Sequence, residues 1–432
     1  MNYAAKTKKK LYALIQHMSK DLTHYVKDPD RDFVRNRKLS FGDMIKLILS
    51  LGANNTRSEL LSFFRFRADT ASLSAFCQQR KKIKIEAFQT LFYLFNNTLS
   101  VFKTHKGYRL LACDGSAIPI PLITDEKKYL PLGGPSNAQG AYIHLNVLYD
   151  ICNKIYVDIR VAPSRTNNEK SAFLEMLHDH DLLHKSIYIM DRGYESYNLM
   201  AHISNQSQYY LIRIKDNHLG GFARVFPHPN TEEYDVSHNR VFTRKRAKKY
   251  MEHPEIYTYV RHKYNDYDFF TPKNEFYQMT FRILRIEVAK GVFECFVTNL
   301  PIDEFNANEI KELYKMRWGV ETSFRELKYT LGLLYFHSKK EEFILQEVYA
   351  GLILYNYCQI ITSHVTLKHK DRTYEYQLIY TMAIKLCCIF LKNNSLKSDI
   401  EKLIEKELLP IRPGRNAERK YRKPYKSFLY RV

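Results

Sequence analysis

The sequence predicts an α/β fold with helical regions at both ends. Three observations support this prediction: apolar residues near both ends recur with helical periodicity, the middle alternates short apolar runs with helical segments, and two of those runs end in an aspartate. With 432 residues, the chain is long enough for two or three domains and a substantial hydrophobic core.

The charge of the chain indicates the kind of partner. The formal net charge is +21, and the basic residues recur along the whole length. This excess favours a polyanion, most simply nucleic acid, because neutralised phosphates release their counterions. A basic protein without such a partner is the alternative. The 33 tyrosines and 26 phenylalanines exceed what a core usually requires, so some are candidates for stacking on bases.

The cysteines and the apolar segments favour a soluble protein in a reducing compartment. The seven cysteines are scattered without a C-x-x-C pair, which argues against a disulfide framework or a zinc site. No secretory signal is recognisable near the N-terminus. The most apolar segment, 343–362, is interrupted by polar residues, so we expect a buried helix and not a membrane span. These features predict a cytoplasmic protein without membrane contact.

Residues 1–105 are predicted to form a helical DNA-binding domain. Apolar periodicity indicates helices over 41–51, 58–66 and 75–85. The third of these helices is polar and basic, carrying Gln78, Gln79, Arg80, Lys81, Lys82 and Lys84. A short helix, a tight connection and a basic helix are compatible with a helix-turn-helix reader of DNA. A solvated basic helix is the alternative interpretation.

Residues 106–215 are predicted to form the first part of an α/β core. The segment reads as three strands, a helix, a strand, a helix and a strand, at 109–114, 144–149, 155–161, 168–180, 186–191, 197–205 and 208–214. This order is that of a ribonuclease-H-like core.

The remaining chain is predicted to interrupt and then complete that core. Residues 216–299 have strand-like composition and form a β-rich insertion. The core resumes over 300–370, where a long helix is predicted at 306–331. Residues 371–432 are predicted as a helical C-terminal region with a basic tail from residue 412.

A stripe of four polar side chains lies on one face of the predicted long helix. Tyr314, Arg317, Glu321 and Lys328 fall within an arc of roughly 60° over about 21 Å of helix. Packing does not require so mixed a stripe, whereas a site for a metal ion and phosphate oxygens does. Two further carboxylates, Asp114 and Asp191, end apolar runs predicted as neighbouring strands.

Together these carboxylates predict metal-dependent chemistry on a phosphodiester. Hard cations held by carboxylates stabilise charge on the attacking and leaving oxygens, and Mg²⁺ needs few protein ligands. Each residue has a simpler explanation when taken alone, because a strand-terminal aspartate is often a turn cap and a lone helical glutamate is usually solvated. The coincidence of Asp114, Asp191 and Glu321 favours the site.

Several histidines are weaker candidates for function. His178, Asp179, His180 and His184 suggest a zinc site, but the first two histidines do not share a helix face, and no third ligand is evident. His144 and Asn146 lie on one face of a predicted strand. For His144, a core histidine is favoured over one that approaches the carboxylates.

The predicted helix also carries a recognisable signature. The segment Tyr314-Lys-Met-Arg317-Trp318-Gly-Val-Glu321-Thr-Ser-Phe-Arg-Glu-Leu-Lys328 resembles the tyrosine–arginine–glutamate–lysine signature of DDE transposases of the IS-four family, which includes the Tn-five-like enzymes. The runs Asp114-Gly-Ser and Asp191-Arg-Gly-Tyr are similar to that family's first and second aspartate motifs. The resemblance extends over nearly the whole chain.

The resemblance implies a role for each of these residues. Asp114, Asp191 and Glu321 would be the catalytic, metal-binding triad, with Mg²⁺ as cofactor and Mn²⁺ as an alternative. Tyr314, Arg317 and Lys328 would contact phosphates near the transposon end, and Arg suits bidentate phosphate contact. For Trp318, the only tryptophan, stacking on DNA and packing in the core are equal alternatives.

The same resemblance implies a transposase of a bacterial insertion sequence. It would bind inverted repeats in double-stranded DNA, cleave the ends with two divalent ions and transfer the 3′ ends to target DNA. It would act as a homodimer in the DNA complex, located in the cytoplasm and at the nucleoid when bound. Two alternatives remain open: a non-catalytic or domesticated DNA-binding protein of the same fold, and a related nuclease without strand transfer.

Overall fold

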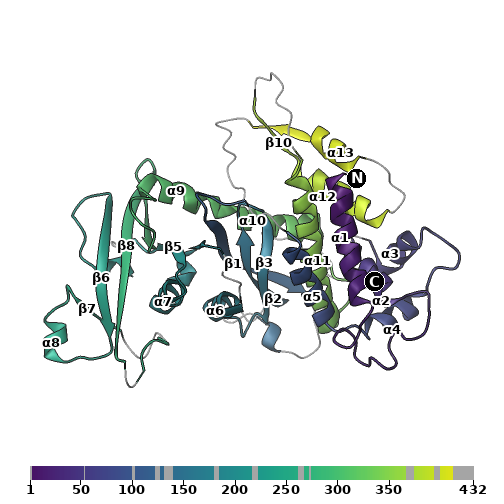
Figure 1. The fold of residues 1–432 in the computed structure, drawn as a ribbon, viewed down its shortest axis with the longest axis horizontal. Coiled ribbons are helices and arrows are strands. Elements are labelled where there is room, and N and C mark those ends of the chain that lie inside the picture. The colour runs from purple at the N-terminus through teal and green to yellow at the C-terminus, as the bar shows by residue number, and fades with distance from the viewer. Residues whose placement is uncertain are drawn as a thin grey trace.

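A computed structural model shows one large sheet flanked by helices, which confirms the predicted mixed α/β class. It describes residues 2–52, 54–99, 103–121, 127–130, 140–179, 184–216, 222–260, 267–271, 274–365, 374–393 and 399–411. His180 and the predicted basic tail from residue 412 lie outside these ranges. The molecule is elongated, with β6–β8 at one end and most helices at the other (Figure 1).

The sheet of the described residues has nine strands in the order β3-β2-β1-β4-β5-β9-β8-β6-β7. Their bounds are β1 Arg109–Ile120, β2 Ala141–Asp150, β3 Ile155–Pro163, β4 Ser186–Met190, β5 Tyr209–Ile214, β6 Tyr234–Thr243, β7 Tyr257–Tyr259, β8 Phe276–Ala289 and β9 Val292–Thr298. A separate pair joins β10 (Tyr376–Leu378) to β11 (Leu408–Pro410).

The thirteen described α-helices are α1 Tyr3–Met18, α2 Phe41–Leu49, α3 Thr56–Phe63, α4 Leu73–Arg80, α5 Glu86–Asn97, α6 Glu169–Asp179, α7 Tyr197–Asn205, α8 Lys248–Met251, α9 Ala307–Met316, α10 Trp318–Arg325, α11 Glu341–Thr362, α12 Tyr380–Lys392 and α13 Ile400–Lys406. Short helical turns are η1 Lys127–Tyr129, η2 Arg192–Tyr194, η4 Phe222–Val225 and the π-helical η5 Glu326–Thr330. In the described parts of the chain, no helix is both long and apolar enough to cross a membrane.

Alternating side chains divide the centre of the sheet into two packed faces. Along β1, Leu110 and Ala112 join one hydrophobic core, while Leu111 and Cys113 join the other, as the two-residue period of a strand requires. Helices α6 and α7 pack on the second face, and α9, α10 and α11 on the first (Figure 1). Polar groups placed where β1 and β4 stop pairing can therefore be reached by helices from both faces.

The central strands follow the element order read from the sequence. The chain runs β1, β2, β3, α6, β4, α7, β5, with β1, β2 and β3 antiparallel and β1, β4 and β5 parallel. The region after β5 continues the same sheet. Strand β9 pairs with β5, β8 with β9, β6 with β8 and β7 with β6, so this region extends the central strands edge to edge.

The N-terminal and C-terminal helices pack together around α11. Helix α11 contacts α1, α2 and α5 on one side and α12 on another. The backbone amide of Ala4 donates to Glu401 Oε1 at 2.7 Å, and the Tyr12 hydroxyl donates to the Leu391 carbonyl at 2.7 Å. Asn356 of α11 pairs with both backbone groups of Tyr156, which ties this helical layer to β3.

A buried ion pair fixes α4 to α11. Arg80 is only 1% exposed, and its guanidinium lies 2.9 Å from Glu347 Oε1. It also donates to Gln346 Oε1 and to the Phe343 carbonyl. Gln79 is buried as well. Within the predicted basic helix, these two side chains therefore lie in the protein interior, and the partners of Arg80 lie on a helix far along the chain.

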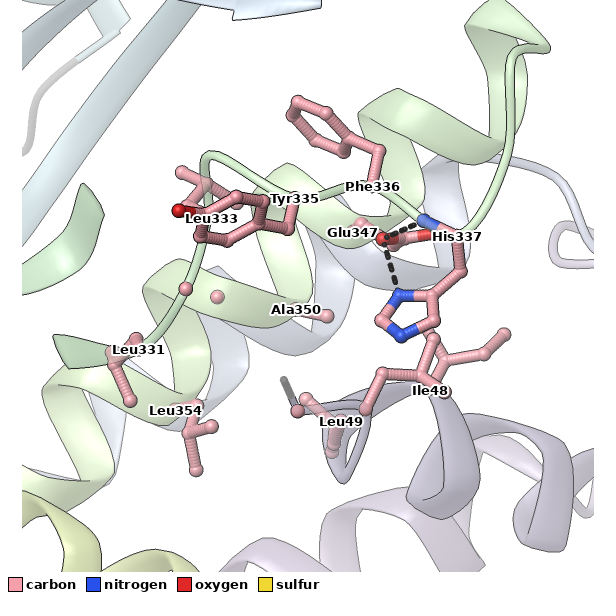
Figure 2. A pocket seen from close by; sticks show the side chains of 14 residues that line it. Ile48, Leu49, Leu331, Leu333, Tyr335, Phe336, His337, Glu347, Ala350 and Leu354 are labelled. Carbon is pink, nitrogen blue, oxygen red and sulfur yellow. Dashed lines mark hydrogen bonds and ion pairs between the residues drawn. The ribbon is translucent and has the colours of Figure 1, made fainter. Parts of the chain in front are cut away.

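Glu347 also anchors the chain that follows the η5 turn. It accepts hydrogen bonds from the backbone amide of His337 at 3.0 Å and contacts His337 Nδ1 at 3.1 Å. Figure 2 shows this pair beside a small pocket, with Leu49 of α2 and Leu354 of α11 on its wall. The end of the helix that carries the stripe is thus held by the helical layer.

Candidate active site

Asp114 and Asp191 lie side by side where two parallel strands separate. The pairing of β1 with β4 runs from Arg109 opposite Ser186 to Cys113 opposite Met190, and the two aspartates come next. Strand β1 continues to Ile120 because β2 remains its partner. Asp114 therefore lies within the strand, whereas the sequence predicted it at the end of the strand. Asp191 caps η2 and accepts from the Arg192 amide at 2.7 Å.

The predicted long helix is formed in three sections. Helix α9 starts at a capping box of Asn306 and Glu309 and ends at Met316, α10 starts at Trp318, and η5 follows with π-helical turns. Arg317 lies at the junction between α9 and α10. Despite the junction, Tyr314, Arg317 and Lys328 all bond groups in β1 or directly after β4, and Glu321 bonds Arg317.

Arg317 connects two of the predicted carboxylates. Its Nη1 donates to Asp114 Oδ2 at 3.3 Å and its Nη2 donates to Glu321 Oε1 at 2.7 Å. The guanidinium is 4% exposed, whereas the side chain of Glu321 is 38% exposed. Tyr314 and the negative charges of Asp114, Asp191 and Glu321 raise the pKa of Arg317 against the opposing effect of burial. One buried cation therefore bonds two of the three acidic residues.

Asp191 has its own set of donors. Arg213 of β5 lies 2.7 Å from Asp191 Oδ1, and the Tyr314 hydroxyl donates to the same oxygen at 3.3 Å. Burial acts to raise the pKa of Asp191, but the Arg192 amide and the Arg213 charge outweigh it, so the pKa is lowered. This carboxylate is held in its ionised form.

Asp114 behaves differently. Burial raises its pKa to about 6, even though Arg317 and the Gly115 amide act in the opposite direction, and nearby Glu321 and Glu169 raise it further. The two neighbouring aspartates thus differ in how readily they lose their protons. Such a separation is common where two carboxylates share a functional site.

Lys328 and Trp318 flank this arrangement. Lys328 Nζ donates to Ser116 Oγ at 2.8 Å and to the Ala117 carbonyl at 2.9 Å, so η5 is attached to β1 just beyond Asp114. Burial lowers the pKa of Lys328. Trp318 is 49% exposed and its ring lies 6.0 Å from the Arg317 guanidinium. It is therefore a surface side chain beside the site and not a core indole.

Two neighbours of the site differ from what the sequence favoured. Arg213 stands in an apolar strand, where a lone charged residue is the one available signal. His144 was interpreted as a core histidine, but its Nε2 lies 3.0 Å from Glu169 Oε1 beside β1. The zinc alternative has no support among the described residues, where His178 contacts Asp179 and Asp179 pairs with Arg160.

The donor set fits a hard divalent cation. Carboxylate oxygens are the ligands that Mg²⁺ and Mn²⁺ prefer, and Arg317 shows that a positive group fits between Asp114 and Glu321. In the described parts of the chain, no three acidic, histidine or cysteine side chains stand in the arrangement of a metal cluster. Guanidinium groups of Arg317 and Arg213 hold the carboxylates instead.

Comparisons with known proteins give a family model and relatives that are all transposases. The model of the family described as "Transposase DDE domain" matches residues 105–357, which is more than half of the chain and includes all the predicted site residues. The transposase for insertion sequence element IS231B of Bacillus thuringiensis subsp. berliner is 22% identical over 369 residues, covering 75% of this chain and 73% of its own. The transposase for IS231C of the same organism is 21% identical over 415 residues, covering 85% and 81%.

Shorter and more distant similarities also occur. The putative transposase InsL for insertion sequence element IS186A of Escherichia coli (strain K12) is 33% identical over 57 residues, or 13% of this chain and 15% of its own. A piggyBac transposase synaptic complex with hairpin DNA, solved by cryo-EM, has a TM-score of 0.45 at 10% identity, covering 96% of this chain and 84% of that one. The family match confirms the resemblance read from the motifs, and the chain belongs to the family of transposases with a DDE domain.

Proposed function

We propose that this protein is the transposase of an insertion sequence. It binds the inverted repeats of double-stranded DNA, cleaves the ends with two divalent metal ions, and transfers the 3′ ends to target DNA. The observation that carries the proposal is that Arg317 bonds both Asp114 and Glu321 while Tyr314 of the same stripe bonds Asp191, in a chain of the DDE transposase family.

In this proposal Asp114, Asp191 and Glu321 hold Mg²⁺, with Mn²⁺ as a substitute. The ions, when bound, would stabilise charge on the attacking and leaving oxygens of the phosphodiester. Tyr314 positions Asp191 through its hydroxyl, and Arg213 keeps that carboxylate ionised. Because burial raises the pKa of Asp114 to about 6, this carboxylate is ionised at neutral pH but takes up a proton more readily than Asp191 in mild acid.

We assign the DNA contacts to side chains in and beside the site, of which Trp318 is exposed and Arg317 is buried. Arg317 is suited to bidentate phosphate contact, Lys328 supplies a point charge, and half-exposed Trp318 is placed to stack on a base. Tyr314 contributes its hydroxyl near the scissile strand. The same family likeness supports a homodimer on DNA, in the bacterial cytoplasm and at the nucleoid when bound.

The proposal also divides the chain into functional parts. Residues 106–215 and 300–370 form a ribonuclease-H-like catalytic core, supported by the antiparallel β1–β3 and the parallel β1, β4 and β5. Residues 216–299 are a β-rich insertion that prolongs the sheet. Residues 1–105 bind DNA, and the region 371–432, whose described helices are α12 and α13, forms the C-terminal part.

The test compares the triad variants Asp114→Asn, Asp191→Asn and Glu321→Gln on DNA that contains the element's ends, with Mg²⁺. We expect cleavage to fall by at least about 10³-fold in each, because each loses a ligand worth several kcal/mol in the transition state. Glu312→Gln is the matched control, since Glu312 is an exposed carboxylate on the neighbouring helix α9. Wild-type rates of cutting and joining in the triad variants would refute the proposal.

Strand transfer is measured separately from cleavage. Labelled 3′ ends that become covalently attached to a second duplex show joining, whereas cleavage without joining identifies a nuclease. End binding without cleavage under Mg²⁺ or Mn²⁺ identifies a non-catalytic relative.

A further inference from the structure

Glu169 brings a fourth carboxylate to the edge of the candidate site. It is the first residue of α6, which packs against β1 and β2 on the face opposite α10 (Figure 1). Its Oε1 lies 3.0 Å from Nε2 of His144, a residue of β2. The pair is partly exposed, so it is accessible to small ions from solvent.

The pair fills the space that Gly115 leaves open. A Cβ atom at Gly115 would lie 2.3 Å from His144 Nε2 and 2.6 Å from Glu169 Oε1, closer than atoms tolerate. The backbone of Gly115 does not have a positive φ, so the missing side chain and not backbone freedom explains the glycine. The residue directly after Asp114 thus lacks a side chain where the Glu169 carboxylate approaches.

The second glutamate oxygen faces the other aspartate motif. A Cβ atom at Gly193 would lie 3.6 Å from Glu169 Oε2, and Gly193 is two residues after Asp191. One oxygen therefore lies against the strand position after Asp114 and the other against the η2 turn after Asp191. No other carboxylate among the described residues is placed against the glycines of both motifs.

The charged groups around Glu169 favour the binding of a cation at this position. Its carboxylate is close enough to Asp114 to oppose the ionisation of that residue. Its contact partner is the imidazole of His144, and not one of the arginines that hold Asp114, Asp191 and Glu321. Two carboxylates this near each other repel unless a cation lies between them, and oxygen-preferring divalent ions satisfy that need.

We propose that Glu169 is a fourth carboxylate of the divalent-metal site, presented from α6 through the gap at Gly115 and held by His144 when no metal is bound. This inference rests on the proposed function, because it adds a residue to the same metal site. A purely structural role, in which the His144–Glu169 pair only attaches α6 to β2, is the competing explanation. The proposal and the structural explanation differ in whether Glu169 affects metal affinity.

The two explanations of Glu169 are distinguished by Mn²⁺ binding to the DNA-free protein. This binding is measured by calorimetry and by electron paramagnetic resonance. We expect Glu169→Gln to weaken Mn²⁺ binding by about tenfold or more, as is typical for a residue at the margin of a metal site. Glu175→Gln is the matched control, because Glu175 is an exposed carboxylate on the same helix. It is expected to bind Mn²⁺ as the wild type does.

Asp114→Asn distinguishes failure of this inference from failure of the proposed function. If Asp114→Asn weakens Mn²⁺ binding but Glu169→Gln does not, Glu169 is structural and the inference is wrong. If neither variant changes Mn²⁺ affinity, the metal site itself is refuted, and the inference with it.

Glu169→Asp covers the case in which Glu169→Gln fails to fold. It keeps the charge but shortens the side chain by one methylene, so we expect Mn²⁺ affinity between that of the wild type and that of Asp114→Asn. A folded Glu169→Asp variant with wild-type affinity and an unchanged Mn²⁺ spectrum would overturn the inference.

Discussion

Two buried arginines of this protein hold carboxylates in contrasting ways. Arg80 uses all its nitrogens within the helical layer, on Gln346, on the Phe343 carbonyl and on Glu347, which is 8% exposed. Arg317 is as deeply placed but holds Asp114 and Glu321, which remain 20% and 38% exposed. Within the described chain, its Nε has no hydrogen-bond partner.

The difference separates a structural ion pair from a functional one. A charge pair that is enclosed on all sides contributes to the fold and is strongly destabilising when broken. A pair whose acidic members still face solvent can exchange partners, because water replaces part of the lost interaction. The network around Arg317 is therefore available to metal ions and phosphates, whereas the network around Arg80 is not.

The largest expected effect is on stability, from Glu347→Ala. This change leaves the Arg80 guanidinium buried without its carboxylate and removes the acceptor of the His337 amide, so we expect a loss of about 3–5 kcal/mol. Urea unfolding measures it. The control is Glu342→Ala, on the same helix in a more exposed pair with Lys27, with an expected loss of under about 1 kcal/mol. Equal losses in the two variants would contradict the contrast.

Arg317→Gln is expected to reduce activity more than stability. We expect end cleavage to fall by about 10²-fold, because a preorganised charge near the reacting phosphate is removed. The free energy of unfolding should change by less than about 1.5 kcal/mol, since Asp114 and Glu321 are partly solvated. Arg325→Gln, an exposed arginine at the end of α10, is the control. A loss of stability comparable to that of Glu347→Ala would show that Arg317 is structural.

The smallest expected effect is a difference in pH dependence between Mn²⁺ affinity and the contribution of Glu347 to stability. Burial raises the pKa of Asp114 to about 6, so protons compete with Mn²⁺ and affinity should fall by up to about tenfold per pH unit below that value. Burial opposes ionisation of Glu347 too, but Arg80 and His337 outweigh it and lower its pKa. Its contribution to stability is therefore present above the ordinary glutamate value and lost only as pH falls through the lowered pKa.

Calorimetry with Mn²⁺ and urea unfolding, both from about pH 5 to pH 7, check this difference. Metal affinity should change across that interval, while the stabilising contribution of Glu347 should not. A Mn²⁺ affinity that stays constant over the interval would contradict the raised pKa of Asp114.

Local patterns in the sequence predicted the parts of the molecule that local physics controls. The order of strands and helices from β1 to β5 follows from apolar periodicity, and the stripe from Tyr314 to Lys328 follows from helical spacing. The break at Arg317 was not predictable from spacing alone, and neither was the bond of its guanidinium to Asp114 on β1, since that bond joins segments far apart in the sequence.

Contacts between distant segments account for what the sequence did not reveal. Arg80 looked like a DNA-facing residue because its partner Glu347 lies on another helix, far along the chain. The extension of β1 beyond Asp114 depends on β2, and the roles of Arg213 and Glu169 depend on which residues the sheet places beside them. Such pairings have no signature within a short window of sequence.

The packing of α11 among the N-terminal helices has a consequence for synthesis on the ribosome. Arg80 meets Gln346 at a separation of 266 positions, and Lys8 meets the Phe390 carbonyl at 382. The N-terminal helices are synthesised first, and their apolar faces therefore stay uncovered until nearly the entire polypeptide has been made. A prematurely terminated product would keep those faces exposed, so quality-control proteases should remove it before it could occupy DNA in place of the full-length protein.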